Sequence, residues 1–261
     1  MASPWIAAIG ALFLWWFSTG AILMVVKRAD RGDASAHLNA TLWGVPFLAL
    51  GVAATAASME AGTILNIYLG FIAALAIWGW IELAFLTGVI TGPVKAPCPA
   101  SLLGHSRFGR AFGTVAYHEI ALLIALVALW VATAGSENMI AAWTFTVLFV
   151  ARISAKLNLF YGVPRINTEF LPKPLAHLPS YFRYDQVNGL LPFSIMTLGF
   201  VTAIFLQGAM SAEAAADKVA LALLTSLLGL ALLEHLLMVL PLPDAKLWRW
   251  MLPAPKIEQP E

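Results

Sequence analysis

Long apolar runs separated by short polar breaks dominate the chain. Each run has about 20 residues or more, the length that a helix needs to cross the hydrocarbon core of a bilayer. The pattern predicts an all-α fold: a polytopic integral membrane bundle of seven transmembrane helices, in one domain over residues 1–261. The predicted spans are residues 4–26, 38–58, 64–90, 112–133, 139–161, 188–209 and 216–240.

The first apolar run is expected to be a spanning helix and not a cleavable signal peptide. It has no basic residue in front of it, it ends at Lys27-Arg28, and it is longer than the apolar part of a signal peptide. Turn signals such as Gly92-Pro93 separate later runs.

The composition agrees with a chain that lies mostly in lipid. Hydrophobic residues make up 61% of it and charged residues 11%, whereas about 25% of an ordinary soluble domain is charged. The net charge of +1 gives no indication of a nucleic-acid partner. Because Cys98 is the single cysteine, an internal disulfide and a cysteine-based metal site are both excluded.

The basic residues predict how the helices are oriented. Fourteen of the fifteen Lys and Arg residues lie in or beside the first, third and fifth breaks or the C-terminal tail, and only Lys218 does not. The positive-inside rule therefore predicts an N-terminus outside the cytoplasm and a cytoplasmic C-terminus. It also places two loops, residues 91–111 and 162–187, in the cytoplasm. Both are short for domains and long for simple connections.

Seven charged or histidine residues lie at least five residues inside the ends of the predicted spans. They are Glu82, His118, Glu119, Arg152, Lys156, Glu234 and His235. At about 1.5 Å per residue, all seven fall in the cytoplasmic half of the membrane, within roughly 10 Å of one another in depth. A charge near the middle of a span costs about 2.5–3.5 kcal/mol and normally faces the bundle interior. The pattern therefore predicts one buried polar cluster.

Two interpretations of this cluster remain open. Arg152 and Lys156 are four residues apart and share a helix face, so they require acidic partners, for which Glu82, Glu119 and Glu234 are the candidates. The cluster is then either an ion-pair network that fixes helix packing or a site for a metal, a tetrapyrrole or a proton.

The sequence gives little support to a metal enzyme. His118 and His235 are the candidate metal ligands, because imidazole nitrogen binds many metals. However, His118-Glu119-Ile120-Ala121-Leu122 has Leu where a zinc protease has its second His. There is no glycine-rich phosphate loop and no nucleophile elbow, which argues against phosphoryl or acyl transfer. His37, His105 and His177 are expected to contact water.

The stretch from Ala151 to Pro192 is the most distinctive part of the chain. Gly162 and Pro164 end a helix, and the residues after them mix apolar, aromatic, proline and charged types. Such a segment is expected to lie at the cytoplasmic interface or to be held by a partner. The predicted partner-contact residues are Arg165, Glu169, Phe170, Tyr181 and Arg183.

This stretch resembles the PuhE family, also called photosynthetic complex assembly protein 2, of phototrophic bacteria. The resemblance rests on residues 154–158 (Ser-Ala-Lys-Leu-Asn), 167–172 (Asn-Thr-Glu-Phe-Leu-Pro) and 178–182 (Leu-Pro-Ser-Tyr-Phe), with residues 162–163 and 188–192 beside them. The length and the predicted spans also fit the family over nearly the whole chain.

The resemblance implies a multi-pass protein of the bacterial inner membrane, encoded among photosynthesis genes. In that membrane, the N-terminus that the charge pattern places outside the cytoplasm is periplasmic. The resemblance further implies a role in building the photosynthetic reaction centre and its light-harvesting complex, or in modulating or delivering bacteriochlorophyll to it, with their subunits or other assembly factors as partners. We expect this role to be non-catalytic. Bacteriochlorophyll or a precursor is the cofactor that it suggests. Two alternatives remain: a metal- or haem-dependent membrane enzyme of tetrapyrrole or quinone metabolism, and a carrier of pigment or protons.

Overall fold

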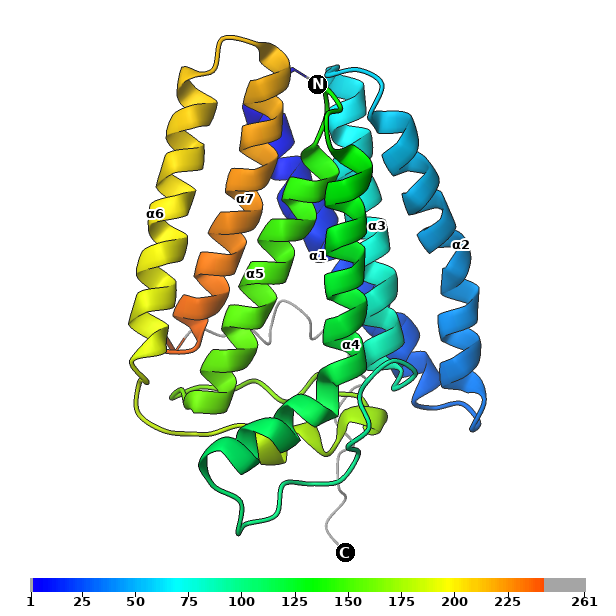
Figure 1. Ribbon diagram of the computed structural model, residues 1–261, viewed down its shortest axis with the longest axis vertical. Coiled ribbons are helices and arrows are strands. Elements are labelled where there is room, and N and C mark those ends of the chain that lie inside the picture. Colours follow the sequence, from blue (N-terminus) through cyan, green and yellow to red (C-terminus); the bar gives the residue numbers. More distant parts are fainter. Residues whose placement is uncertain (1, 242–261) are drawn as a thin grey trace, which may run out of the picture.

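Residues 2–241 fold into a bundle of seven long helices (Figure 1). The structure, a computed structural model, describes residues 2–241. The helices are α1 (Pro4–Ala29), α2 (Ala36–Ser58), α3 (Ile64–Leu86), α4 (Gly104–Thr133), α5 (Ile140–Tyr161), α6 (Leu190–Ser211) and α7 (Ala215–Leu237). All seven are long and apolar enough to cross a membrane. The predicted all-α class and number of spans are confirmed, and the orientation of the termini stays a prediction.

The helix α3 is the centre of the bundle. In its most apolar window 61% of the residues are buried, against 17% for α1, α4 and α6. Those outer helices present apolar side chains to their surroundings, as expected of helices that meet lipid. The protein is therefore a multi-pass membrane protein with its polar chemistry concentrated around α3, α5 and α7.

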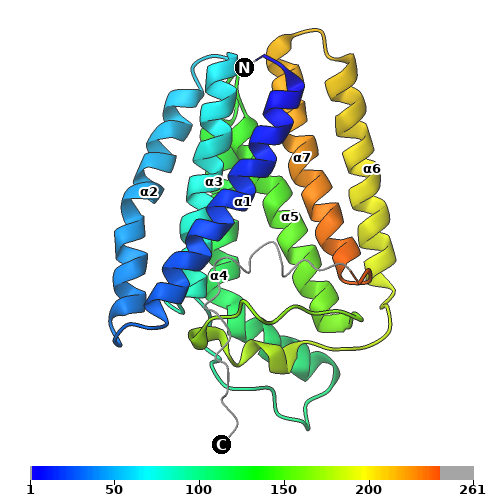
Figure 2. The same ribbon diagram turned by 180° about the vertical axis from the view of Figure 1, so that it is seen from behind.

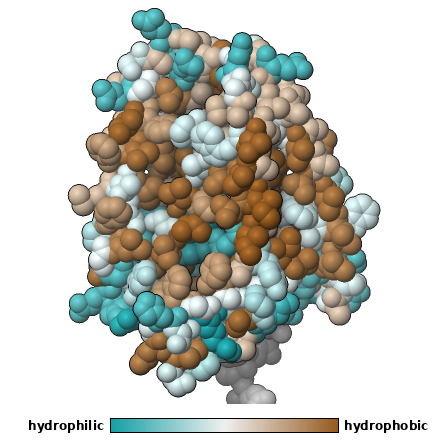
Figure 3. All heavy atoms as spheres, in the orientation of Figure 1, coloured by the Kyte–Doolittle hydropathy of each residue, from teal (hydrophilic) through white to brown (hydrophobic). Residues whose placement is uncertain are grey.

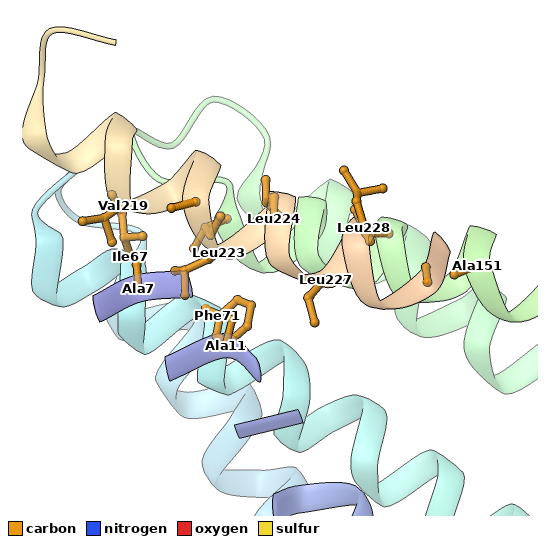
Figure 4. Close-up of a cluster of buried hydrophobic side chains, with 14 of the residues drawn as sticks. Ala7, Ala11, Ile67, Phe71, Ala151, Val219, Leu223, Leu224, Leu227 and Leu228 are labelled. Carbon is orange, nitrogen blue, oxygen red and sulfur yellow. The ribbon is translucent and has the colours of Figure 1, made fainter. Parts of the chain in front are cut away.

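The main apolar core joins α1, α3 and α7 (Figure 4). Ala7 and Ala11 of α1 are fully buried and lie against Phe71 of α3 and Leu223 of α7. Small side chains let helix backbones approach closely, which is the usual basis of helix packing in membranes. Figure 2 shows that α1 lies next to α7 at the end with the N-terminus and diverges from it toward the other end.

At that other end, the fourth helix differs from the expected span. It begins at Gly104, in a segment that the sequence pattern placed in the loop 91–111. The added turns carry His105, Arg107 and Arg110, and a hydropathy pattern does not recognise such a polar helical extension. The guanidinium of Arg107 holds the extension by donating to the carbonyl oxygens of Phe160 (3.3 Å) and Tyr181 (2.7 Å).

Residues 162–189 fold under the same end of the bundle. They include two short 3-10 helices, η1 (Lys173–Leu175) and η2 (Leu178–Tyr181). A single β-bridge joins Val163 to Tyr184. We call the end formed by residues 30–35, 87–111 and 162–189 the capped end; the charge pattern predicts that it is cytoplasmic.

Several contacts fix residues 162–189 to the rest of the protein. The ammonium group of Lys173 donates to the carbonyl of Asp30 at 2.6 Å, and the backbone N–H of Cys98 donates to Ser180 Oγ at 2.8 Å. Leu175 and Leu178 pack on Phe85 of α3. Side chains from three loops thus form one layer. The predicted C-terminal basic residues Lys246, Arg249 and Lys256 lie outside the described residues.

Candidate functional site

Two ion pairs join α5 to the neighbouring helices at the depth of the predicted cluster. Arg152 of α5 donates through Nη2 to Glu82 Oε2 of α3 at 3.0 Å. One turn later, Lys156 donates to Glu119 Oε1 of α4. The two basic side chains share one face of α5, and each forms an ion pair with a different carboxylate. The pairs therefore fix the positions of α3, α4 and α5 relative to one another.

Figure 3 shows a small hydrophilic patch within the mainly apolar middle band of the surface, between the positions of α4 and α5 in Figure 1. The Lys156–Glu119 pair spans these two helices, and 24% of the Lys156 side chain is exposed, against 10% for Glu119. The long apolar stem of lysine lets the ammonium group approach the membrane interface. The protein therefore encloses this pair only in part.

His118 lies beside the Arg152–Glu82 pair and is fully buried. Its Nε2 is 3.7 Å from Glu82 Oε1, too far for a hydrogen bond, and its ring stacks on Phe85 with the ring centres 4.3 Å apart. Neither ring nitrogen has a hydrogen-bond partner among the described residues. Burying an imidazole without hydrogen bonds is energetically unfavourable. Both ring nitrogens of His118 could therefore bind a further donor or acceptor.

His235 belongs to a separate polar group. Its Nδ1 is 2.8 Å from the carbonyl oxygen of Ala231, which can only accept, so Nδ1 carries a proton. Its Nε2 lies within hydrogen-bond distance of Ser154 Oγ, at 2.9 Å. Ser154 Oγ donates to Ser194 Oγ of α6 at 3.0 Å. The side-chain amide of Asn158 also donates to Ser194 Oγ, at 3.1 Å. This group ties together α5, α6 and α7.

The residues that were predicted to form one cluster therefore form two separate groups. Within the described residues, Glu234 makes no hydrogen bond or ion pair with either group. His118 lies with the ion pairs, whereas His235 lies with Ser154. Within residues 2–241, no three or more His, Cys, Asp or Glu side chains are placed so that they could hold a metal. The metal ligation considered for His118 and His235 has no further ligands in the part of the chain that the structure describes.

Sequence reasoning did not find Ser194 or the amide of Asn158. The available signal was the presence of small polar residues inside otherwise apolar helices. Asn158 is fully buried and four residues after Ser154, a spacing that places both on one helix face. Such residues often make hydrogen bonds between membrane helices.

A cavity of about 290 Å³ lies next to the Arg152–Glu82 pair. Side chains of α1, α3, α5, α7 and residues 167–171 line it. Its polar members include Glu82, Arg152 and the exposed Glu234, and two indoles, Trp15 and Trp78, belong to its walls. Nothing in the hydropathy pattern predicted this cavity, because it depends on the angle between α1 and α7.

The predicted partner-contact residues occupy three kinds of position. Arg165, Glu169 and Arg183 are exposed, and Arg183 forms an ion pair with Asp185 at 2.7 Å. Phe170 is half-buried and lines the cavity. Tyr181 is buried, with its hydroxyl donating to the carbonyl oxygen of Ala96 at 3.0 Å.

The expectation that Tyr181 faces a partner was wrong, because it packs inside the capped end. The expectation for His177 was also wrong, since only 8% of this residue is exposed to water. Burial lowers the pKa of the His177 imidazole, and the positive charge of Lys95 lowers it further.

Comparisons with known proteins match the whole chain. A family model described as "Protein of unknown function (DUF3623)" matches residues 1–259. A protein of Rhodobacter capsulatus, named "Uncharacterized 30.4 kDa protein in puhA 5'region", is 48% identical over 260 residues. The alignment covers 100% of this chain and 94% of that protein. No solved structure matches. The chain therefore belongs to the DUF3623 family.

Proposed function

We propose that the protein is a non-catalytic assembly factor for the photosynthetic reaction centre and its light-harvesting complex in the bacterial inner membrane. The main support for this proposal is the Rhodobacter capsulatus relative, which is 48% identical over 260 residues. Its name places it in the puhA 5' region. That position suggests a link to photosynthesis gene clusters. The resemblance of residues 154–192 to the PuhE family supports the same role.

The geometry of the capped end supports assembly through protein contacts. Its charged residues Arg165, Glu169 and Arg183 are exposed, while the backbone around them is held. The N–H of Arg165 donates to the carbonyl oxygen of Met238 at 3.1 Å, and the N–H of Arg183 donates to that of Leu159 at 3.0 Å. A surface whose backbone is already fixed loses little conformational entropy on binding a partner.

The buried polar groups also support a structural role at the centre of the bundle. Each of the four ionisable side chains in the two ion pairs faces an opposite charge, and His235 is satisfied by Ser154 and a backbone carbonyl. Buried pairs of this kind fix which helices pack together. In this proposal they keep the bundle rigid, and the capped end makes the contacts.

The proposal is tested by exchanging charges on the exposed surface. The double variant Arg165→Glu/Glu169→Lys keeps the net charge of the loop and removes no buried contact of either side chain. We expect the yield of assembled reaction-centre complex to fall several-fold, because charge complementarity with the partner is reversed. Near-infrared absorption of membranes measures this yield, and immunoblotting measures the abundance of the variant.

The matched control is Glu213→Lys/Lys218→Glu, the same exchange near the connection of α6 and α7, at the opposite end of the bundle. It should leave both complex yield and protein abundance at the wild-type level. If the exchange at residues 165 and 169 leaves complex yield unchanged at normal abundance, the proposed contact surface is refuted. If complex yield is also normal when the gene is deleted, the assembly role itself is refuted.

A further inference from the structure

The cavity beside Arg152 occupies a wedge between α1 and α7. The two helices touch through Ala7, Ala11 and Leu223 at one end and separate toward the capped end (Figure 2). Residues of α3 and α5 line the inner side, and Phe170 and Leu171 line it from the capped end. Figure 2 shows α2 and α6 on the outer flanks of this pair, and α1 and α7 are both long and apolar enough to span a membrane. The cavity between them therefore lies in the membrane-spanning part of the bundle.

The lining of the cavity is amphipathic. Most of it is apolar, with Leu75, Leu227 and the indoles of Trp15 and Trp78 among its members. The charged members are Glu82, Arg152 and Glu234. Ser18, Thr19 and Asn167 are its other polar members. A mostly apolar pocket with a few polar groups is typical of small-molecule sites. A molecule in this cavity would keep an apolar body in the walls and a polar end at these three residues.

Arg152 determines which hydrogen-bonding group the polar end of such a molecule must carry. Its ion pair with Glu82 uses Nη2 only. Its Nε has no hydrogen-bond partner among the described residues but is enclosed by protein, so the terminal nitrogens are the donors that a molecule in the cavity can reach. A third of its side chain is exposed, although it lies in the middle of a membrane-spanning helix. A guanidinium group has five N–H donors and no acceptor. Within the membrane, the remaining donors require an acceptor, and the cavity is where one can be placed.

Charge and size narrow the class of molecule. Glu82 and Glu234 supply two carboxylates and Arg152 one guanidinium, so a molecule with its own negative charge would meet an excess of negative charge. A neutral carbonyl oxygen accepts hydrogen bonds without this repulsion. The volume of about 290 Å³ is at the lower limit of small-molecule pockets, which suits one ring or one lipid headgroup and leaves any tail outside.

We infer that this cavity binds a neutral, lipid-soluble molecule that enters sideways from the bilayer and places a carbonyl oxygen against Arg152. A quinone ring, the ester of a glycerolipid and the ester or ketone of a pigment share this chemistry. The inference goes beyond the proposed assembly role and does not depend on it, because it concerns a different part of the protein.

The test uses the full-length protein, purified in mild detergent and placed in phosphatidylcholine nanodiscs. Before the protein is placed in nanodiscs, solvent extraction and mass spectrometry of the detergent-purified protein identify and count the co-purified carbonyl compounds. Added decylubiquinone, a neutral quinone, is the binding probe, and quenching of the cavity tryptophans is the readout. We expect about one retained molecule per protein or saturable quenching by the probe. The mass of the retained molecule distinguishes a quinone, a pigment and a phospholipid as its source.

Two variants make the test specific for the cavity. Gly79→Leu fills it from α3, where an added Cβ would meet only the flexible end of Ile22 at 3.4 Å, and should lower occupancy at least ten-fold. Arg152→Lys keeps the charge that pairs with Glu82 and removes the planar set of donors, and should weaken binding about ten-fold. Gly229→Leu on α7, where nothing lies within 4 Å of an added Cβ, is the matched control and should bind as wild type does.

Two results would overturn the inference. The first is a wild-type protein that retains no carbonyl compound and shows no saturable quenching, since the cavity then holds water. The second is a folded Gly79→Leu protein, monodisperse and as thermally stable as Gly229→Leu, that binds as wild type does. Loss of complex yield in the charge-exchange variant at residues 165 and 169 would affect neither result, so the two proposals fail separately.

Discussion

The Arg152–Glu82 pair allows a quantitative test of what the buried charges contribute to the bundle. The perturbation is a double-mutant cycle of Glu82→Leu, Arg152→Met and the double variant. Each single substitution leaves the other charge without its partner, and the double variant removes both charges. His118 and Lys156, which also lie near Glu82, are unchanged in all four proteins.

The expected magnitude follows from the distance between the paired atoms. At 3.0 Å and an effective dielectric constant of about 20, the attraction is about 5.5 kcal/mol. Desolvation offsets a large part of it, because both groups lie in the membrane-spanning part of the bundle. We expect each single variant to lose about 3 kcal/mol of unfolding free energy, and the double variant to lose less than the sum by about 2–3 kcal/mol.

The assay is reversible unfolding by sodium dodecyl sulfate in mixed micelles, followed by circular dichroism. The free energy of unfolding is compared among the four proteins at the same detergent composition. A double variant whose loss equals the sum of the single losses would refute the reasoning, because it would mean that the two charges do not stabilise each other. Single variants within about 0.5 kcal/mol of wild type would refute it too.

Two further predictions concern the capped end. Gly92→Ala should destabilise the protein by about 3 kcal/mol in thermal unfolding, because the added Cβ would lie 2.2 Å from the backbone oxygen of Gly113. The control Gly109→Ala, where no atom lies within 4 Å of the added Cβ, should be neutral or slightly stabilising. Because the folded pKa of His177 is lowered, the native state binds fewer protons than the unfolded state, whose pKa is about 6.5. The protection of backbone amides in residues 173–182 from hydrogen exchange should therefore fall as pH drops from about 7 to 5, and His177→Gln should show a smaller fall; an equal fall in both proteins would contradict this assignment.

The sequence pattern was sufficient for the helices and for part of the polar chemistry. Spans of about 20 apolar residues and the distribution of Lys and Arg predicted seven helices, because lipid leaves a spanning backbone few other structures. The spacing of Arg152 and Lys156 predicted that they share a face and need acidic partners, and the structure shows Glu82 and Glu119 in these positions.

The features that the pattern could not predict depend on how each helix is rotated about its axis, on the angles at which helices cross, and on how the loops fold. His118 and His235 lie at similar depth, and only the rotation of α4 and α7 decides that they belong to different groups. The burial of Tyr181 and His177 depends on how residues 162–189 fold against two other loops. The cavity depends on the divergence of α1 from α7, for which Ala7 and Ala11 gave a signal only at the end where the helices touch.

The order of the ion-pair partners along the chain has a consequence for how the protein enters the membrane. Arg152 and Lys156 make α5 costly to insert alone, at about 2.5–3.5 kcal/mol for each basic residue near the centre of a helix. Their partners Glu82 and Glu119 are on α3 and α4, which are synthesised earlier. When α5 leaves the ribosome, both carboxylates are already in the bilayer. The insertion of α5 is thus coupled to the helices before it, and a chain that lost either glutamate would be at risk during biogenesis before any folded protein existed.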